Sequence, residues 1–350
     1  MNGAPGKTRG VEDELTTTLG SADRVISGRP HLAVLDGWRG LSILFVLASH
    51  LLPLGPKAWQ LNEMTGPMGM ALFFTLSGFL ITRILLADAD IPKFLVRRGL
   101  RIVPLAWLAM AIAFPLSLSP ASVYLPNFLF YANLPPQHLA EVASHLWSLC
   151  VEMQFYLAIA LVVRVGGTRG LYLMPLCCVA VTANRVLDGA YVDIVTWRRV
   201  DEILAGATLA LVYSRQLGTR LPAAVPKANA YLFLALFALS CHPLGGFMNY
   251  LRPYFAAVLV GTTLFRPTRL ASAVLKSRPL RYIAAVSFAL YVIHGLLVDT
   301  WLGSGDKLVK YLKRPLFLGV TFALAHVSTF YYERHWIDWG KRLTSPRRTG

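Results

Sequence analysis

The sequence predicts an all-α, polytopic integral membrane protein with about ten transmembrane helices. Hydrophobic residues make up 55% of the 350-residue chain and charged residues 15%, against roughly 25% charged residues in soluble domains. Apolar runs also recur along the chain after residue 40, and each is long enough to cross a hydrocarbon core about 30 Å thick. A soluble globular fold is therefore excluded.

The ten predicted helices follow these apolar runs in chain order. They span residues 39–55, 67–87, 102–119, 147–163, 170–186, 200–214, 229–243, 253–266, 282–302 and 315–333.

Charge gives the predicted orientation. The net charge of +16 would suit a nucleic-acid partner, but the basic residues lie in short loops between apolar runs, so we predict no such partner. Most Lys and Arg residues fall on the cytoplasmic side if the N-terminus is cytoplasmic, so both termini are predicted to be cytoplasmic. The loop with Lys307, Lys310, Lys313 and Arg314 falls on the outer side and departs from this rule.

Three regions are predicted along the chain. Residues 1–30 are polar and lack the apolar core of a signal peptide, so we expect a disordered cytosolic tail. Residues 31–335 form the membrane domain, and residues 336–350 a basic cytosolic C-terminal tail. The four cysteines lie in or beside apolar runs without metal-type spacing, so no metal site is predicted.

The first predicted helix carries the most informative pair of residues, Arg39 and His50. Eleven residues separate them, which places both on one helix face about 16 Å apart. Asp36 precedes Arg39 by three residues and shares that face. Ionisable groups at membrane depth mark functional sites by default. We expect one of the pair near a membrane surface and the other near mid-bilayer.

The second and third helices contribute small and basic residues. Ser77 and Gly78 give a small surface where another helix can approach closely, and helix packing alone would explain them. Arg98 and Arg101 stand three residues apart on one face, and planar guanidinium groups suit phosphate oxygens. A basic loop that only sets topology is the alternative for this pair.

The fourth helix places Ser148 and Glu152 on a shared face. A carboxylate at this depth must be paired, neutral or wet, so Glu152 is either paired with an Arg or positions a substrate group. His145 precedes this helix, and we expect an interfacial histidine without a catalytic part.

The later helices are less explicit. Asp201 and Glu202 open the sixth helix, where the helix dipole favours acidic residues, so a structural role is expected. In the ninth helix Ser287 precedes Tyr291 by four residues, and Tyr291 precedes His294 by three. This second imidazole in an apolar helix favours a polar cavity, although a neighbouring hydroxyl would also satisfy it.

Read in order, these motifs resemble the acyltransferase-3 family of integral membrane acyltransferases over residues 32–335. Two features depart from the family pattern: Met153 stands where a second Glu is common, and Cys150 where Ser is common. The matching segments are Arg39 to His50, Phe73 to Phe79, Arg98 with Arg101, Leu146 to Tyr156 and Ser287 to His294.

The resemblance implies transfer of an acyl group, commonly acetyl, from a cytosolic coenzyme A thioester to a hydroxyl of a glycan or glycolipid. Acetyl-coenzyme A would be a donor substrate, and no cofactor is expected to be permanently bound. O-antigen lipopolysaccharide, other polysaccharides and peptidoglycan are open as acceptors. A bacterial inner membrane is the implied location, contact with membrane lipid is expected, and assembly into a homo-oligomer is left open.

The resemblance also suggests roles for site residues. His50 would act as general base or form an acyl-histidine, while Arg39 holds the donor or stabilises negative charge. Glu152 would position the acceptor or hold His50 in one tautomer. Donor contacts are expected from Arg98, Arg101 and Ser77, and support from Asp36, Asp201, Tyr291 and His294. The fused extracellular hydrolase-like domain of some relatives is expected to be absent.

The competing function is transport. Buried charges in a many-helix protein also suit a proton-coupled transporter or flippase of a glycan precursor. Two equivalent halves with matched Gly or Pro breaks would favour that function, and the sequence contains none. A purely structural subunit would leave Arg39 and His50 unexplained.

Overall fold

The computed structural model describes residues 32–345, which form helices and connecting segments without a strand among them. The predicted disordered tail, residues 1–30, lies outside the described residues. The α-helices are α2 (Ala33–Leu51), α3 (Leu61–Ala87), α4 (Ile91–Leu116), α5 (Tyr124–Phe128), α6 (Trp147–Gly166), α7 (Met174–Leu187), α8 (Asp201–Tyr213), α9 (Arg220–Ala224), α10 (Ala230–Cys241), α11 (Arg252–Phe265), α12 (Arg269–Leu275), α13 (Arg278–Val298), α14 (Lys307–Val327) and α15 (Arg334–Leu343).

All ten predicted segments are helical, and the predicted class, an all-α polytopic membrane protein, is confirmed. Six helical stretches are long and apolar enough to cross a membrane, and a bent pair around α9 and α10 would make seven. The expected ten spans exceed this number because α7, α8, α10 and α11 have only 12 to 14 residues. Such helices are about 18–21 Å long, which is shorter than the hydrocarbon core.

Small residues let the central helices α2, α3 and α8 pack backbone to backbone. A Cβ at Gly78 would lie 1.8 Å from the Ile203 carbonyl oxygen, and one at Gly206 would lie 1.9 Å from that of Thr75. The α3–α8 contact therefore requires glycine at both positions. Gly78 of the predicted small surface has a packing role, while the neighbouring Ser77 side chain turns to another helix.

The bounds of α2 change the depth of its two ionisable residues. This helix begins at Ala33, six residues before the predicted start, and ends at Leu51. Arg39 is therefore its seventh residue and His50 lies in its last turn. The predicted bounds would have put Arg39 at the helix end and His50 in the interior, and the structure reverses that order.

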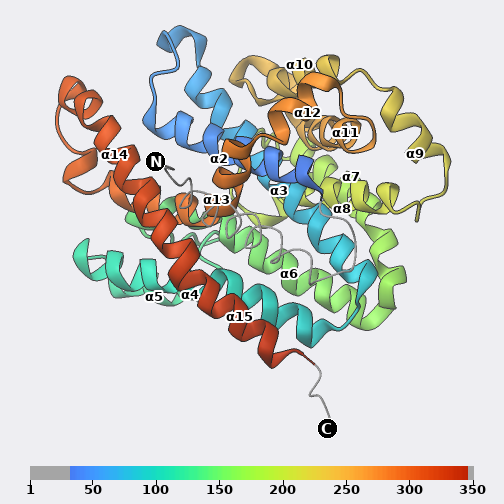
Figure 1. The fold of residues 1–350 in the computed structure, drawn as a ribbon, viewed down its shortest axis with the longest axis horizontal. Coiled ribbons are helices and arrows are strands. Elements are labelled where there is room, and N and C mark those ends of the chain that lie inside the picture. Colours follow the sequence, from blue (N-terminus) through green and yellow to red (C-terminus); the bar gives the residue numbers. More distant parts are fainter. Residues whose placement is uncertain (1–31, 346–350) are drawn as a thin grey trace, which may run out of the picture.

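The C-terminal part of the chain forms one continuous rod of α14, a π-helix (η9, Ser328–Glu333) and α15, 37 residues from Lys307 to Leu343. At 1.5 Å per residue the rod is about 55 Å long, which is longer than the thickness of a hydrocarbon core of about 30 Å. It runs along one side of the bundle, drawn in red in Figure 1.

The predicted C-terminal tail is largely part of this rod. Residues 336–343 belong to α15, which packs on α4: the Leu100 side chain would lie 3.1 Å from a Cβ at Gly340, and Arg97 Nε donates to Thr344 Oγ1 at 2.7 Å. The packed domain therefore continues past the expected boundary at residue 335. Residues 346–350 lie outside the described part of the chain.

Candidate active site

Three histidines from distant parts of the chain meet at one end of the bundle, and we call them the histidine cluster. His50 comes from the last turn of α2, His294 from α13, and His145 from the short 3₁₀-helix η3 (Glu141–Leu146) that leads into α6. His50 Nδ1 lies 3.1 Å from His294 Nε2. The His294 ring centroid lies 5.3 Å from those of both His50 and His145.

The hydrogen bonds of the cluster assign its protons. His294 Nδ1 lies 3.1 Å from the Leu290 carbonyl oxygen, and because a carbonyl only accepts, Nδ1 carries the proton. In neutral His294 the Nε2 atom is then the acceptor, so His50 Nδ1–H donates to it. His50 Nε2 consequently has a free lone pair, and this side chain is exposed. The network thus leaves one basic nitrogen open to a ligand.

Backbone contacts fix the third imidazole. His145 Nε2 donates to the Val292 carbonyl oxygen at 3.2 Å, and the Tyr291 hydroxyl donates to the His145 carbonyl oxygen. The ring lies so close to Gly295 that a Cβ there would be 2.3 Å from ring atoms. We expected His145 to be an interfacial residue without a catalytic part; its ring lies against that of His294, and its lack of a catalytic part stays a prediction.

Tyr291 joins the cluster to α6. Its hydroxyl lies 2.6 Å from Ser148 Oγ, and its ring stacks on Phe73 with centroids 6.3 Å apart. Tyr291 and His294, predicted as supporting residues, therefore lie together beside His50. Ser287 lies on the same helix but donates to the Ala284 carbonyl oxygen.

Glu152 forms a separate buried group with Ser77 and Tyr156. Both hydroxyls donate to Glu152 Oε1, and the carboxylate is only 5% exposed. Arg98 is near enough to act electrostatically on the Tyr156 hydroxyl. Glu152 was expected either to position the acceptor or to hold His50 in one tautomer; the hydrogen-bond partner of the His50 ring is His294, and the acceptor role stays a prediction.

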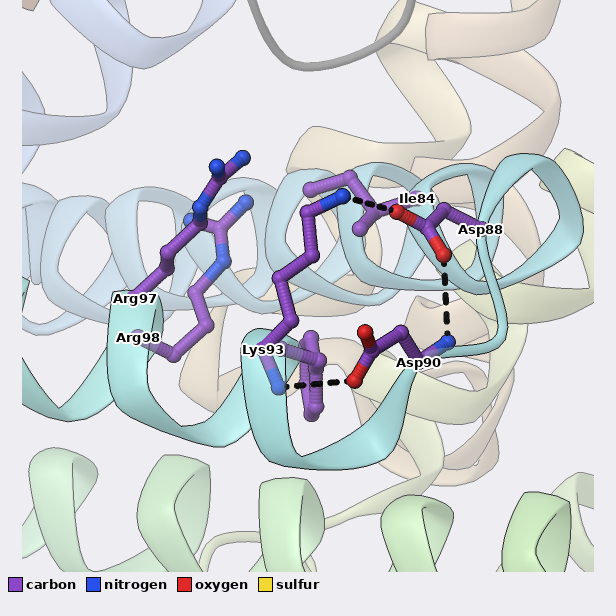
Figure 2. Close-up of a pocket in the computed structure, with 7 residues that line it drawn as sticks. Ile84, Asp88, Asp90, Lys93, Arg97 and Arg98 are labelled. Atoms are coloured by element: carbon purple, nitrogen blue, oxygen red, sulfur yellow. Dashed lines mark hydrogen bonds and ion pairs between the residues drawn. The ribbon is translucent and has the colours of Figure 1, made fainter. Parts of the chain in front are cut away.

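A pocket opens at the far end of α3, where the chain turns into α4 (Figure 2). It is a small hollow, partly open to solvent, with a cavity volume of about 30 Å³. Its lining residues are Ile84, Asp88, Asp90, Lys93, Phe94, Arg97 and Arg98.

Three of the lining residues are cationic and two are acidic. Lys93 Nζ donates to Asp88 Oδ2 at 2.6 Å, and this bond holds the pKa of Asp88 below its ordinary value. Arg97 and Arg98 extend from the next turn of α4 beyond this pair (Figure 2). Of these three cations, only Arg98 was predicted from the sequence to contact phosphate.

The two arginines of the predicted phosphate pair face different surroundings. Arg98 lines the pocket, whereas Arg101 acts electrostatically on Glu333. Glu333 is buried in η9, where it accepts hydrogen bonds from Ser328 at 3.1 Å and Thr329 at 3.0 Å. The lining of the pocket includes Arg98 but not Arg101, so the two arginines predicted to bind phosphate do not meet at this pocket.

The remaining predicted residues lie away from the histidine cluster. Arg39 and Asp36 are three or more turns back along α2 from His50, about 16 Å or further. Asp201 forms a buried ion pair with Arg185 at 2.5 Å. Its position fits the structural alternative for the acidic start of α8.

A second buried ion pair continues this network. Glu202 pairs with Arg252 at 2.6 Å and with Arg199 at 3.4 Å. The Arg199 guanidinium lies 5.5 Å from the centre of a Trp147 ring, next to Ser148. Among the described residues no group of three or more His, Cys, Asp or Glu side chains has a metal-binding arrangement.

The acyltransferase domain family matches residues 32–340. The chain is 25% identical to the peptidoglycan O-acetyltransferase OatA of Listeria monocytogenes, over 76% of this chain and 49% of that protein. It is 26% identical to the putative peptidoglycan O-acetyltransferase YrhL of Bacillus subtilis, over 74% of this chain and 47% of that protein.

A shorter segment is 30% identical to the O-acetyltransferase OatA of Staphylococcus aureus, over 38% of this chain and 25% of that protein. The chain therefore spans about half the length, or less, of the relatives that it matches. No solved structure matches the fold.

Proposed function

Because the chain belongs to the acyltransferase-3 family, we propose that it is a membrane O-acetyltransferase that transfers an acetyl group from acetyl-coenzyme A to a hydroxyl of a glycan. The observation that carries this proposal is the free lone pair on His50 Nε2. It lies at the exposed side of a hydrogen-bonded histidine pair. A hydroxyl nucleophile needs such a base, because an alcohol is a weak nucleophile while it keeps its proton.

In the transfer step, His50 Nε2 takes the proton of the acceptor hydroxyl as its oxygen attacks the thioester carbonyl. The imidazolium that forms keeps its Nδ1–H bond to His294 Nε2, which stabilises the positive charge. When the tetrahedral intermediate collapses, the carbon–sulfur bond breaks and the thiolate takes the proton from His50. The products are the acetyl ester and free coenzyme A.

A covalent route uses the same lone pair. His50 Nε2 would attack the thioester carbonyl, release the thiolate and carry the acetyl group before a hydroxyl takes it. Both routes require the tautomer that His294 imposes. The structure favours neither, since each uses the same atom in the same orientation.

The pocket beside α4 suits the donor's phosphates. Three cations line it, Lys93, Arg97 and Arg98, and guanidinium groups bind phosphate oxygens in bidentate fashion. Asp88 competes for Lys93, so binding of a phosphate would replace one anion by another. Arg39, the seventh residue of α2, remains a proposed donor contact, whereas Arg101 is outside the pocket lining and acts electrostatically on Glu333.

Positions along α3 relate the two ends of the site. Phe73 packs against Tyr291 of the histidine end, Ser77 contacts Glu152, and Ile84 lines the pocket. From Phe73 to Ile84 the helix rises about 16 Å. The flexible arm of coenzyme A would extend from the pocket past Ser77 and Glu152 to His50, and these two residues would position it.

The acceptor would approach at the histidine end. The similar proteins from Listeria and Bacillus are named peptidoglycan O-acetyltransferases, which supports a glycan hydroxyl. With a cytosolic donor, the pocket end and both termini would face the cytoplasm of a bacterial inner membrane. The basic residues of the pocket agree with that orientation.

Release of free coenzyme A by purified protein in detergent tests the proposal. Acetyl-coenzyme A is supplied with and without peptidoglycan fragments and other glycans, and His50→Ala and His335→Ala are measured alongside. His335 is exposed and lies outside the site, so its variant should match the wild type. His50→Ala should lose about 10³-fold in kcat. Acceptor-dependent release that survives in His50→Ala would refute the assignment.

A further inference from the structure

The first two turns of α14 carry four cations on one face. Lys307, Lys310, Lys313 and Arg314 fall within about 120° of the helix circumference, and we call them the α14 basic strip. This is the segment that departs from the charge rule. The rod is about 55 Å long, which exceeds a hydrocarbon core of about 30 Å, and the four cations at its N-terminal turns are its part least suited to that core.

The strip is attached directly to the helix that carries His50. Arg314 Nη1 donates to the Leu51 carbonyl oxygen and lies 3.5 Å from that of His50. These carbonyls are at the C-terminal end of α2, where unpaired backbone acceptors favour a cation. The basic strip and the basic nitrogen of His50 therefore open at the same end of the bundle.

The positive charge of the strip is not neutralised within the described chain. Lys313 donates to the backbone oxygens of Trp301 at 2.8 Å and Ser304 at 3.2 Å, and its ammonium lies 4.1 Å from the centre of a Trp301 ring. Within residues 32–345 none of the four cations forms a salt bridge with a carboxylate. The nearby Asp306 is used as the cap of α14 and accepts from the Val309 amide.

The surroundings of the strip suit a sugar chain. The aromatic rings of Trp301 and Tyr311 flank it and are 66% and 46% exposed. Leu308 and Leu312 are also exposed, but they lie on the opposite side of α14, about 180° from the strip. Lipid contact therefore has its own apolar face, while the cations and aromatic rings face the His50 end.

We propose that the α14 basic strip is the docking surface for the acceptor, and that this acceptor is an anionic glycan bearing phosphate or carboxylate groups. The inference rests on the proposed function and adds the charge of the substrate. The strip binds the anionic groups of the chain, and the neighbouring sugar presents its hydroxyl to His50 Nε2. Lys307 and Lys310, at the outer turn, supply the long-range attraction.

Direct binding tests the proposal without any turnover. The purified protein in detergent is titrated into a fluorescent oligogalacturonate and, separately, into a neutral chitooligosaccharide of equal length, and anisotropy is recorded. The test variant is Lys307→Gln with Lys310→Gln. The control is Arg220→Gln with Lys227→Gln, which removes two exposed cations from the α9 segment at the other side of the bundle (Figure 1).

We expect the test variant to weaken oligogalacturonate binding about fivefold to tenfold at low salt, with little change for the neutral chain and in the control. Equal weakening in both variants, or none in the test variant, overturns the proposal. The proposal is also overturned if the test variant changes only retention on anionic lipid nanodiscs, because the strip would then contact lipid.

His50→Ala separates this inference from the proposed function. This variant should bind oligogalacturonate as the wild type does, although it transfers no acetyl group. Strip-dependent binding by a protein that never releases coenzyme A would support the docking surface while contradicting the enzyme. Normal release of coenzyme A with a neutral acceptor, without strip-dependent binding, would support the enzyme while contradicting the docking surface.

Discussion

The two ends of the site are built from different chemistry. At the histidine end, imidazoles bond to one another and to backbone carbonyls, and the Tyr291 hydroxyl bonds to Ser148, with no carboxylate among these contacts. At the α4 end, Lys93, Arg97 and Arg98 lie with two aspartates around an open pocket. The first arrangement suits proton transfer and the second suits phosphate binding. In the proposed function, recognition of the donor is thereby separated from the reacting bond.

The two ends also differ in how the chain assembles them. The His50–His294 contact joins residues 244 positions apart, and the His145–Val292 contact joins residues 147 apart. The Asp88–Lys93 pair spans five positions. The histidine end consequently depends on the packing of the whole bundle, whereas the pocket depends on one interhelix turn.

Replacement of His294 is expected to give the largest change in kcat among the tests of whether the two ends differ in chemistry. Replacement by Ala removes the acceptor that fixes the His50 tautomer, so kcat should fall about 10²-fold with donor KM little changed. His294→Gln retains an acceptor oxygen and should recover part of the loss. Stopped assays of coenzyme A release measure both parameters. A His294→Ala effect confined to donor KM would mean that the two ends are not chemically distinct.

A smaller effect is expected at the pocket. Arg97→Gln together with Arg98→Gln removes two charge-assisted contacts to phosphate, and donor KM should rise about tenfold or more with kcat reduced much less. Arg101→Gln is the matched variant, since Arg101 faces Glu333 instead of the pocket. If Arg101→Gln raises donor KM by more than the double variant, the phosphates bind elsewhere.

The smallest effect concerns the competition for Lys93. Asp88→Asn frees the ammonium, so donor KM should fall about twofold to threefold. Because Lys93 holds the pKa of Asp88 below its ordinary value, the carboxylate stays ionised at neutral and mildly acidic pH. The competition is lost only as pH falls through that lowered pKa. A gain seen between about pH 6 and 8 is thus expected, and an unchanged KM there would argue against phosphate binding at Lys93.

Local patterns in the sequence predicted part of this site. Apolar runs predicted every main helix, since length and composition are properties of one segment. The pairing of Ser77 with Glu152 and the place of His145 were beyond such patterns, because each depends on a partner more than 70 residues away. The predicted number of membrane spans was too high for a different reason. A short helix inside the bundle and a helix that spans the membrane have similar composition.

The depth of Arg39 and His50 shows how a small boundary error changes an interpretation. The helical phase between the two residues was predicted correctly, as both lie in α2. The start of the helix was not, because its first six residues include Asp36 and Gly37, which are poor helix formers. Their helical state comes from tertiary packing: a Cβ at Gly37 would lie 2.2 Å from the Leu275 carbonyl oxygen.

The C-terminal rod connects the two ends of the site. Arg314 of the rod contacts the end of α2. Thirty residues later, Thr344, directly after the rod, accepts a hydrogen bond from Arg97 of α4. One residue inserted between these contacts would shift one end by about 1.5 Å and rotate it by about 100°, so only one of the two could keep its bond. The rod therefore fixes the distance between the two ends, and in the proposed function a donor must span that distance to bring its thioester to His50.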